Sequence, residues 1–218
     1  MKGGAMKGIT FGAYHSYNDF SLILSKKELE SPAVKEVKQE IEGADSDLDL
    51  TDFFGEPKYE NAKHRFTFST LAISEEEFLS LASTIKNALH GKKVRIILDD
   101  DPAFYYVGRV FVSKYHNERQ IGTIEIECDC EPYKFKLAKT VVSRAVNGTE
   151  VITLTNLRKR AVPEITTTAT MTIAFGGFSR SASAGTFVIP ELELVQGENT
   201  VTVTGTGTIT FSYQEGAL

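Results

Sequence analysis

The sequence predicts a mainly β protein with one helix, an α+β fold, made of an N-terminal β-rich domain and a C-terminal β-sandwich. Runs that alternate apolar and polar residues recur along the chain, whereas a single stretch repeats apolar residues at helical spacing. From about Leu137 the composition shifts to Thr, Val, Ile, Gly and Ser, in short strand-like runs separated by turn residues. We therefore expect domains over residues 6–136 and 137–218.

Length and charge narrow the classes of function. A chain of 218 residues with 41% hydrophobic content can bury one large core or two small ones. The net charge of −5 comes without a basic stripe, which argues against specific nucleic-acid binding and against a polybasic membrane patch. No apolar run approaches the roughly 20 residues of a membrane span, and no signal peptide is evident. Because Met6 can serve as the natural start, we expect Met1–Ala5 to be a cloning remnant.

The one predicted helix begins after Ser74. Ser74 and Glu77 have the spacing of a capping box, in which each side chain accepts the other residue's backbone N–H. Gly91, just past His90, supplies the stop. Apolar residues recur at helical spacing between these two ends: Phe78, Leu81, Ala82, Ile85 and Leu89. RFTFST before the helix and VRIIL after it are typical of strands.

The segment TIEIECDC predicts a strand with one buried and one wet face. Ile124, Ile126, Cys128 and Cys130 alternate with acids. A Cys-x-Cys pair can contribute to a zinc site, but the other ligands would have to come from distant positions. We interpret Cys128 and Cys130 as small core residues.

The stretch DDDPAFYYVGRV raises the question of an acid/base or metal site. Three adjacent carboxylates, Asp99, Asp100 and Asp101, could hold a hard cation or push one another's pKa values apart. Asp and Pro are also the usual residues of a tight turn, and strand-like runs lie on both sides. With no basic partner nearby in sequence, a solvated hairpin turn is the preferred interpretation.

A second acidic stretch, ADSDLDLTDFFGEP, has partial calcium-loop spacing. Asp45, Asp47, Asp49, Thr51 and Glu56 fall at ligand positions one, three, five, seven and twelve. Leu50 occupies the sixth position, where such a loop needs Gly, and no helix flanks the segment convincingly. The preferred interpretation is a solvated acidic loop with four apolar anchors: Leu48, Leu50, Phe53 and Phe54.

Other catalytic patterns are incomplete. His15, His64, His90 and His116 are scattered without metal-ligand spacing, and His90 suits a helix-dipole role. GGFSRSAS has Ser181 where a nucleophile elbow needs its second Gly. We therefore expect no enzymatic activity and no catalytic, cofactor-binding or metal-binding residues.

The C-terminal domain is expected to contain short strands in VITLTNL, ITTTATMTIAF, GTFVIPELELV and NTVTVTGTGTITFSY. In the last of these, the Gly-Thr-Gly triplet is expected to turn the chain between Val203 and Ile209, forming a hairpin. No Lys-Ser/Thr follows these glycines, so a nucleotide loop is not expected.

Several segments, in their order and spacing, resemble the distal tail (Dit) proteins of siphophages, the phages with long non-contractile tails, including prophages of Gram-positive hosts. In the first domain these are GITFGAYHSYNDFSLIL, SDLDLTDFFG, the helix closed by His90 and Gly91, DDDPAFYYVGRV and CDCEPYKF. GENTVTVTGTGTITFSY is similar to the closing hairpin of that family's second domain. The family often has a Pro-Gly-Arg-Asp-Gly-like turn where this chain has EGADS at 42–46. The resemblance implies that residues 34–41, whose spacing also fits a helix, form a strand or hairpin arm.

The resemblance implies a structural role. Six copies would form a ring through their first domains, as one ring or two stacked rings, at the virion tail tip after synthesis in the host cytoplasm. The ring would join the tail tube to the baseplate or tip adsorption apparatus, with galectin-like second domains projecting outward and DNA passing unbound through the lumen. Implied partners are the tail tube, tape-measure and tail-tip or receptor-binding proteins, with no membrane and no cofactor.

Candidate ring contacts are Leu48, Leu50, Phe53 and Phe54, because large apolar residues on a polar segment suggest a partner surface. Packing against their own domain is the other interpretation. The sequence leaves two other classes of function to consider. A carbohydrate-binding β-sandwich that recognises host cell-wall polysaccharide is the alternative, although the chain has no Trp. A cell-wall hydrolase would need paired carboxylates in a cleft or a metal site, and the residues do not assemble into either.

Overall fold

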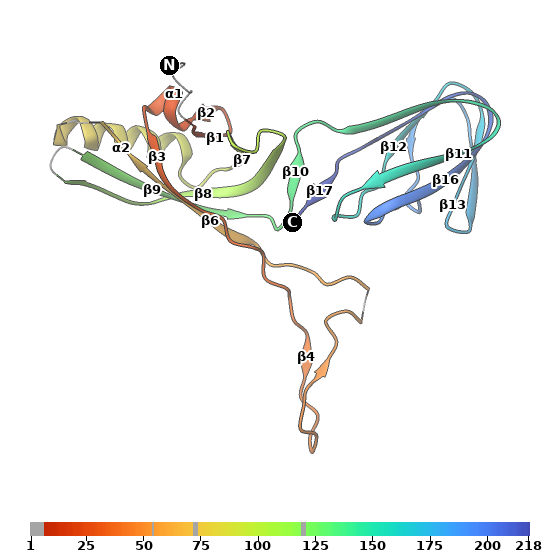
Figure 1. Cartoon of the computed structure of the whole chain (residues 1–218), viewed down its shortest axis with the longest axis horizontal. Coiled ribbons are helices and arrows are strands. Elements are labelled where there is room, and N and C mark those ends of the chain that lie inside the picture. Colours follow the sequence, from red (N-terminus) through yellow and green to blue (C-terminus); the bar gives the residue numbers. More distant parts are fainter. Residues whose placement is uncertain (1–6, 54, 72–73, 119–120) are drawn as a thin grey trace. The chain divides into compact units, whose positions relative to one another are not determined.

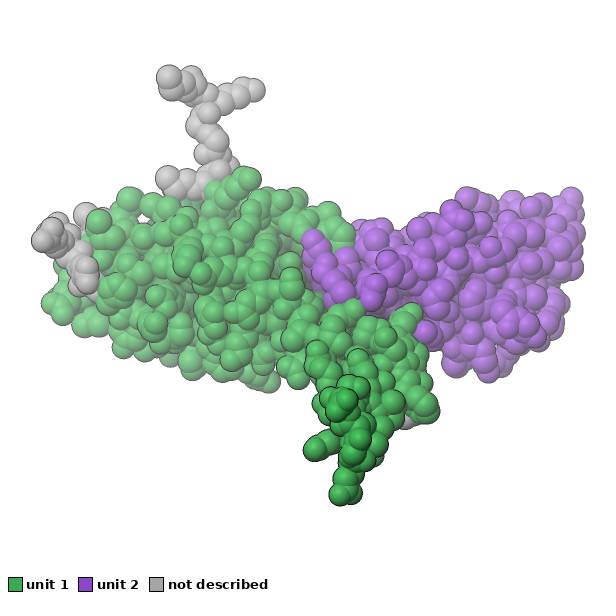
Figure 2. Space-filling view, turned by 60° about the horizontal axis from the view of Figure 1, so that its bottom comes forward, with its two compact units in different colours: residues 1–132 green, residues 133–218 purple. Residues whose placement is uncertain are grey.

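A computed structural model describes residues 7–53, 55–71, 74–118 and 121–218. The chain divides into two compact units, residues 1–132 and 133–218 (Figure 2). The expected mainly β class is confirmed (Figure 1). The described part of the chain contains no helix long and apolar enough to cross a membrane.

Unit 1 is an antiparallel sheet with a helix on one face. The strand order is β2-β1-β7-β8-β9-β6-β3. The strand bounds are β1 Ile9–Phe11, β2 Tyr14–His15, β3 Ile23–Glu28, β6 Ala62–Ser69, β7 Lys93–Leu98, β8 Phe104–Glu118 and β9 Ile121–Cys130. The short strands β4 Lys38–Gln39 and β5 Leu48–Asp49 pair with each other away from this sheet. The helices are α1 Ser16–Phe20 and α2 Glu75–Leu89.

Helix α2 forms for the reasons that its sequence indicates. Ser74 Oγ accepts the N–H of Glu77 at 3.3 Å, and Glu77 Oε2 accepts the N–H of Ser74 at 3.0 Å, so the capping box is confirmed. Gly91 ends the helix with φ +78°, and its N–H reaches the Val110 carbonyl at 2.7 Å. The apolar face of α2 is buried in a core shared with alternate residues of the strands, among them Phe66, Phe68, Ile96, Ile124, Ile126, Cys128 and Cys130.

Two of the expected features in unit 1 are confirmed. β9 buries Ile124, Ile126, Cys128 and Cys130, while its acids stay partly exposed. DDDP forms the turn between β7 and β8, where Asp101 donates its N–H to the Leu98 carbonyl at 3.0 Å. Helix α1 is an element that the sequence did not predict.

Unit 2 is a β-sandwich formed from a curled sheet. Its strands are β10 Lys134–Lys136, β11 Thr140–Asn156, β12 Glu164–Thr167, β13 Met171–Phe175, β14 Phe178–Ala182, β15 Gly185–Val188, β16 Gly197–Tyr213 and β17 Gly216–Ala217. β16 pairs with β11 along its whole length. On its other side β16 pairs first with β13 and then with β12. The sandwich core contains Leu154, Ile165, Ile173, Leu192, Leu194, Val201, Val203, Ile209 and Phe211. Short strand β10 pairs with β17, and both belong to unit 2.

The predicted hairpin in TVTVTGTGTITF is wrong, because β16 continues through both glycines. Gly148 of β11 lies opposite Gly205. Figure 1 shows the paired strands β11 and β16 bending over together along their length. Gly205 and Gly207 have φ +154° and +148°, which L side chains rarely adopt. The glycines therefore allow a paired ribbon to bend from one layer to the other without a turn, which extends the strand that the sequence had divided.

Candidate functional site

The most prominent feature of unit 1 is an arm, defined here as residues 29–61, that leaves the sheet after β3 and returns to β6 (Figures 1 and 2). At its base, Lys35 donates its N–H to the Lys58 carbonyl and Glu60 donates to the Ala33 carbonyl, both at 2.8 Å. Further out, β4 and β5 pair as a short hairpin. The expected hairpin arm over residues 34–41 is thus confirmed, and its helical spacing is incidental.

Short polar side chains set the register of the arm. Asp49 Oδ1 accepts the N–H of Thr51 at 2.9 Å, and Thr51 Oγ1 accepts the N–H of Val37 at 3.1 Å. Hydrogen bonds from the Thr51 side chain and backbone to Asp49 lower the pKa of the Asp49 carboxyl. At the tip, Gly43 turns the chain with φ +83°, and Ala44 donates its N–H to the Ile41 carbonyl at 3.1 Å. Within EGADS, the chain therefore turns at Gly43.

The register gives the arm two unlike faces. Gln39 lies opposite Leu48 and Lys38 opposite Asp49, so alternation places Val37, Ile41, Leu48 and Leu50 on one face. Lys38, Glu36 and Asp49 lie on the other, where Lys38 Nζ donates to Glu36 Oε2 at 2.7 Å. This ion pair raises the pKa of Lys38. The arm is thus an amphipathic ribbon.

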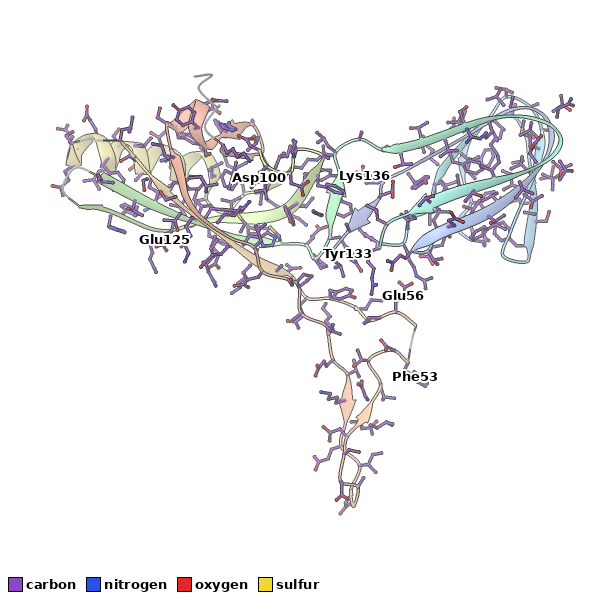
Figure 3. The ribbon with its side chains drawn as sticks, viewed as in Figure 1. Phe53, Glu56, Asp100, Glu125, Tyr133 and Lys136 are labelled. Atoms are coloured by element: carbon purple, nitrogen blue, oxygen red, sulfur yellow. The ribbon has the colours of Figure 1, made fainter. Side chains whose placement is uncertain are left out.

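The apolar face of the arm is exposed to solvent in the single chain. Val37, Ile41 and Leu48 have relative exposures of 52%, 46% and 45%. Phe53, just beyond the ribbon, is 72% exposed and is labelled in Figure 3. An isolated two-stranded ribbon is marginally stable in water, and one with an uncovered apolar face gains stability when that face is covered.

The predicted contact residues fall on or next to this face. Leu48 and Leu50 belong to it, Leu50 being half-buried, and Phe53 follows it. Phe54 lies outside the described residues. Val37 and Ile41 belong to the same face but were not identified from the sequence. In the sequence, Val37 and Ile41 alternate with Lys38 and Glu40, which is the pattern of a two-faced strand. Only the pairing of β4 with β5 shows that Val37 and Ile41 lie on the same face as Leu48.

Asp99 and Asp100 are exposed at the hairpin turn, as the sequence predicts, but contrary to that prediction they have partners, which include basic side chains from other segments. Asp99 Oδ2 accepts the N–H of Gly8 at 2.7 Å and lies 3.0 Å from His15 Nε2. Asp100 pairs with Lys27, which lowers the pKa of the Asp100 carboxyl. These partners come from β2, β3 and the segment before β1, which lie close to the β7–β8 turn only after folding. The acids have a structural role, fastening those segments to the turn.

The four histidines lie in four different environments. His15 caps α1, His116 is exposed on β8, and His90 Nδ1 accepts the N–H of Val112 at 3.1 Å. His64 is buried on β6, and neither ring nitrogen has a hydrogen-bond partner among the described residues. Burial lowers the pKa of His64.

The cysteines are confirmed as core residues. Cys128 and Cys130 are free and buried. Burial raises the pKa of both thiols, that of Cys130 to about 12, so neither is a thiolate at neutral pH.

Metal binding gains no support from the described residues. Within them, no group of three or more His, Cys, Asp or Glu side chains is placed to hold a metal ion. Of the calcium-loop positions, Asp49 and Thr51 bond to the arm itself. The acidic stretch is therefore part of the ribbon and its turns.

Comparisons with known proteins identify the fold. No protein-family model matches the sequence, and a search of curated proteins finds no match. Among solved structures, the chain is similar to the Dit protein of phage SPP1, described as a paradigm of the hub adsorption apparatus in phages that infect Gram-positive bacteria. The TM-score is 0.73 at 12% sequence identity, over 96% of this chain and 99% of that one. The chain thus has a Dit-like fold, as its sequence segments suggested.

Proposed function

We propose that this protein is a structural hub of a bacteriophage tail tip. A Dit-like fold over nearly the whole chain is the observation that carries the proposal. In this role the protein joins the tail tube to the baseplate or the adsorption apparatus. It is made in the host cytoplasm and then resides in the virion. Its partners are the tail tube, tape-measure and receptor-binding proteins.

The hub is a hexameric ring in this proposal, and the arm supplies its contacts. A ring needs heterologous contacts, in which one surface of each subunit meets a different surface of the next. The exposed apolar face of the arm is suited to be one of these surfaces. The contact set is Leu48, Leu50, Phe53 and Phe54, extended by Val37 and Ile41. The charged face of the arm then remains in water.

The hub function needs no catalytic chemistry. Asp99 and Asp100 are engaged in bonds that hold the chain together. The cysteine thiols are buried and protonated. DNA passes the ring without binding, which agrees with a net charge of −5 and with the absence of a basic stripe in the sequence.

Negative-stain electron microscopy of the purified full chain tests this proposal. The expected images show annular particles with sixfold symmetry and an open centre. The double variant Ile41→Gln/Leu48→Gln is expected to lose the rings, whereas Glu40→Gln on the charged face keeps them. Closed particles without a central opening, or rings that persist in the double variant, would contradict the proposed assembly.

A further inference from the structure

Four paired strands of unit 2 share an outer face that has no charged residue over ten positions. The register places Ala174 opposite both Thr202 and Ser179, and Thr202 opposite Val151. Partners opposite each other in an antiparallel pair project to the same side, so the outer face can be read across β14, β13, β16 and β11. Its members are Ser179, Ser181, Thr172, Ala174, Thr200, Thr202, Thr204, Thr149, Val151 and Thr153.

Within these ten positions the face carries no charge, and it is bounded by Glu198, which lies two residues before Thr200 on β16 and projects to the same side. Glu150 and Arg180 lie on the same strands, but the register puts them on the side of Val203 and Ile173, which are core residues. Eight of the ten face residues are Thr or Ser. Thr149 Oγ1 and Thr204 Oγ1 lie 3.0 Å apart across the strands, so some hydroxyls are held in place by their neighbours.

A shallow, open pocket of about 400 Å³ lies on this face, at the β13–β14 turn. Ala174, Ser179, Thr200 and Thr202 contribute from the face, and Gly176–Gly177 with the flanking phenylalanines contribute from the turn. Phe175 and Phe178 are half-buried and stack edge to face, with ring centroids 6.2 Å apart. The pocket therefore combines hydroxyl groups, turn backbone and aromatic rings.

We propose that unit 2 binds a neutral glycan chain in this pocket, with the chain continuing over the hydroxyl face. Thr and Ser hydroxyls donate and accept hydrogen bonds, as sugar hydroxyls do, so the two surfaces can satisfy each other without charge. The C–H faces of a sugar ring pack on Ala174 and on the phenylalanine rings. An anionic polymer would instead require Lys or Arg, and none is on this face. Glycan binding is thus an activity added to the hub role and does not depend on ring formation.

Affinity electrophoresis of the full chain in native gels tests this site. The gels contain laminarin, galactomannan or hydroxyethyl cellulose as neutral probes, or polygalacturonate as an anionic probe. At least one neutral polymer is expected to retard the protein, and polygalacturonate is not. In the double variant Thr200→Val/Thr202→Val, which keeps the β-branched shape, we expect the apparent affinity to fall about tenfold. Thr206→Val, on the same strand but outside the pocket, is the matched control and is expected to bind as the native chain does.

Three results would overturn the glycan site: no retardation by any of the neutral polymers, equal retardation by polygalacturonate, or unchanged retardation of the double variant. Light scattering on the same samples separates this question from the hub proposal. A monomeric protein that is still retarded would leave the glycan site standing and count against the ring. Intact rings without retardation would support the ring and count against the glycan site.

Discussion

His15 Nε2 lies 3.0 Å from Asp99 Oδ2, while His15 Nδ1 accepts the backbone N–H groups of Tyr17 at 3.2 Å and Asn18 at 3.1 Å. Because Nδ1 accepts, the neutral ring carries its proton on Nε2 and donates it to Asp99. One imidazole thus caps helix α1 and joins it to the β7–β8 turn. Asp99, the first acid of DDDP, orients a structural cap.

Asp99→Ala is expected to destabilise the protein by about 1–2 kcal/mol, because it removes the acceptor for both Gly8 N–H and His15. Urea unfolding of the full chain measures this loss. Asp45→Ala removes the same charge from the exposed arm and is expected to change stability by less than about 0.5 kcal/mol. Equal effects of the two variants would show that Asp99 has no special role.

The two helices differ in how far the sequence could predict them. Helix α2 has apolar periodicity over several turns, a Ser–Glu capping box and a terminal Gly, and all three signals agree. Helix α1 has five residues, too few for a periodic pattern, and its cap is His15 rather than Ser, Thr, Asp or Asn. That cap depends on Asp99, far away in the sequence, so local signals could not reveal it.

Buried His64 makes the stability of unit 1 depend on pH. Its folded-state pKa is lowered by burial, so below about pH 6.5 the unfolded chain binds a proton that the folded chain does not. Stability should therefore fall as pH drops from 7 to 5, by at most about 1.4 kcal/mol per pH unit from this residue.

His64→Leu is expected to remove this component of the pH dependence, because it takes away the titrating ring. Urea unfolding at several pH values checks the prediction, with exposed His116→Gln as the control. A native pH profile in His64→Leu would contradict it.

Gly205 of β16 and Gly185 of β15 have similar backbone angles but different surroundings, so alanine variants at the two positions separate the cost of backbone strain from the cost of a steric clash. A Cβ at Gly205 would lie 2.9 Å from Met171 Cγ and 3.1 Å from the Thr170 carbonyl oxygen, whereas a Cβ at Gly185 would meet nothing within 4 Å. Both glycines have φ near +150°, so both alanine variants carry backbone strain of about 1–3 kcal/mol. Gly205→Ala should cost more in thermal unfolding, since it adds the clash. Equal losses would refute the close approach at the bend.

The sequence located β16 but not its course. Val201, Val203, Ile209 and Phe211 all face the core, because the alternation keeps its phase through the two glycines. A Gly-Thr-Gly triplet is typical of a turn, and only the pairing with β11 shows that the ribbon bends instead. The apolar face of the arm could not be predicted for the same reason, because only the cross-strand register shows that Val37 and Ile41 lie on the same face as Leu48.

Glu215 fastens the C-terminal strand of unit 2. Its carboxylate is 3% exposed and accepts from Lys136 Nζ and Thr140 Oγ1. Glu215→Gln removes the buried charge partner of Lys136, which is partly exposed, and is expected to cost about 2 kcal/mol in urea unfolding. Glu193→Gln breaks an exposed pair with Arg160 and should cost less than about 0.5 kcal/mol. A loss at position 215 no larger than the loss at 193 would contradict this account.

The absolute mass of the full chain in solution tests the central claim most directly. Size-exclusion chromatography coupled to light scattering, over a range of protein concentrations, should give six chains of 24.0 kDa, or twelve if two rings stack. Ile41→Gln/Leu48→Gln should shift the species toward monomer, and Glu40→Gln should not. A strict monomer at every concentration, or a hexamer unaffected by the double variant, would contradict a ring held together by the arm.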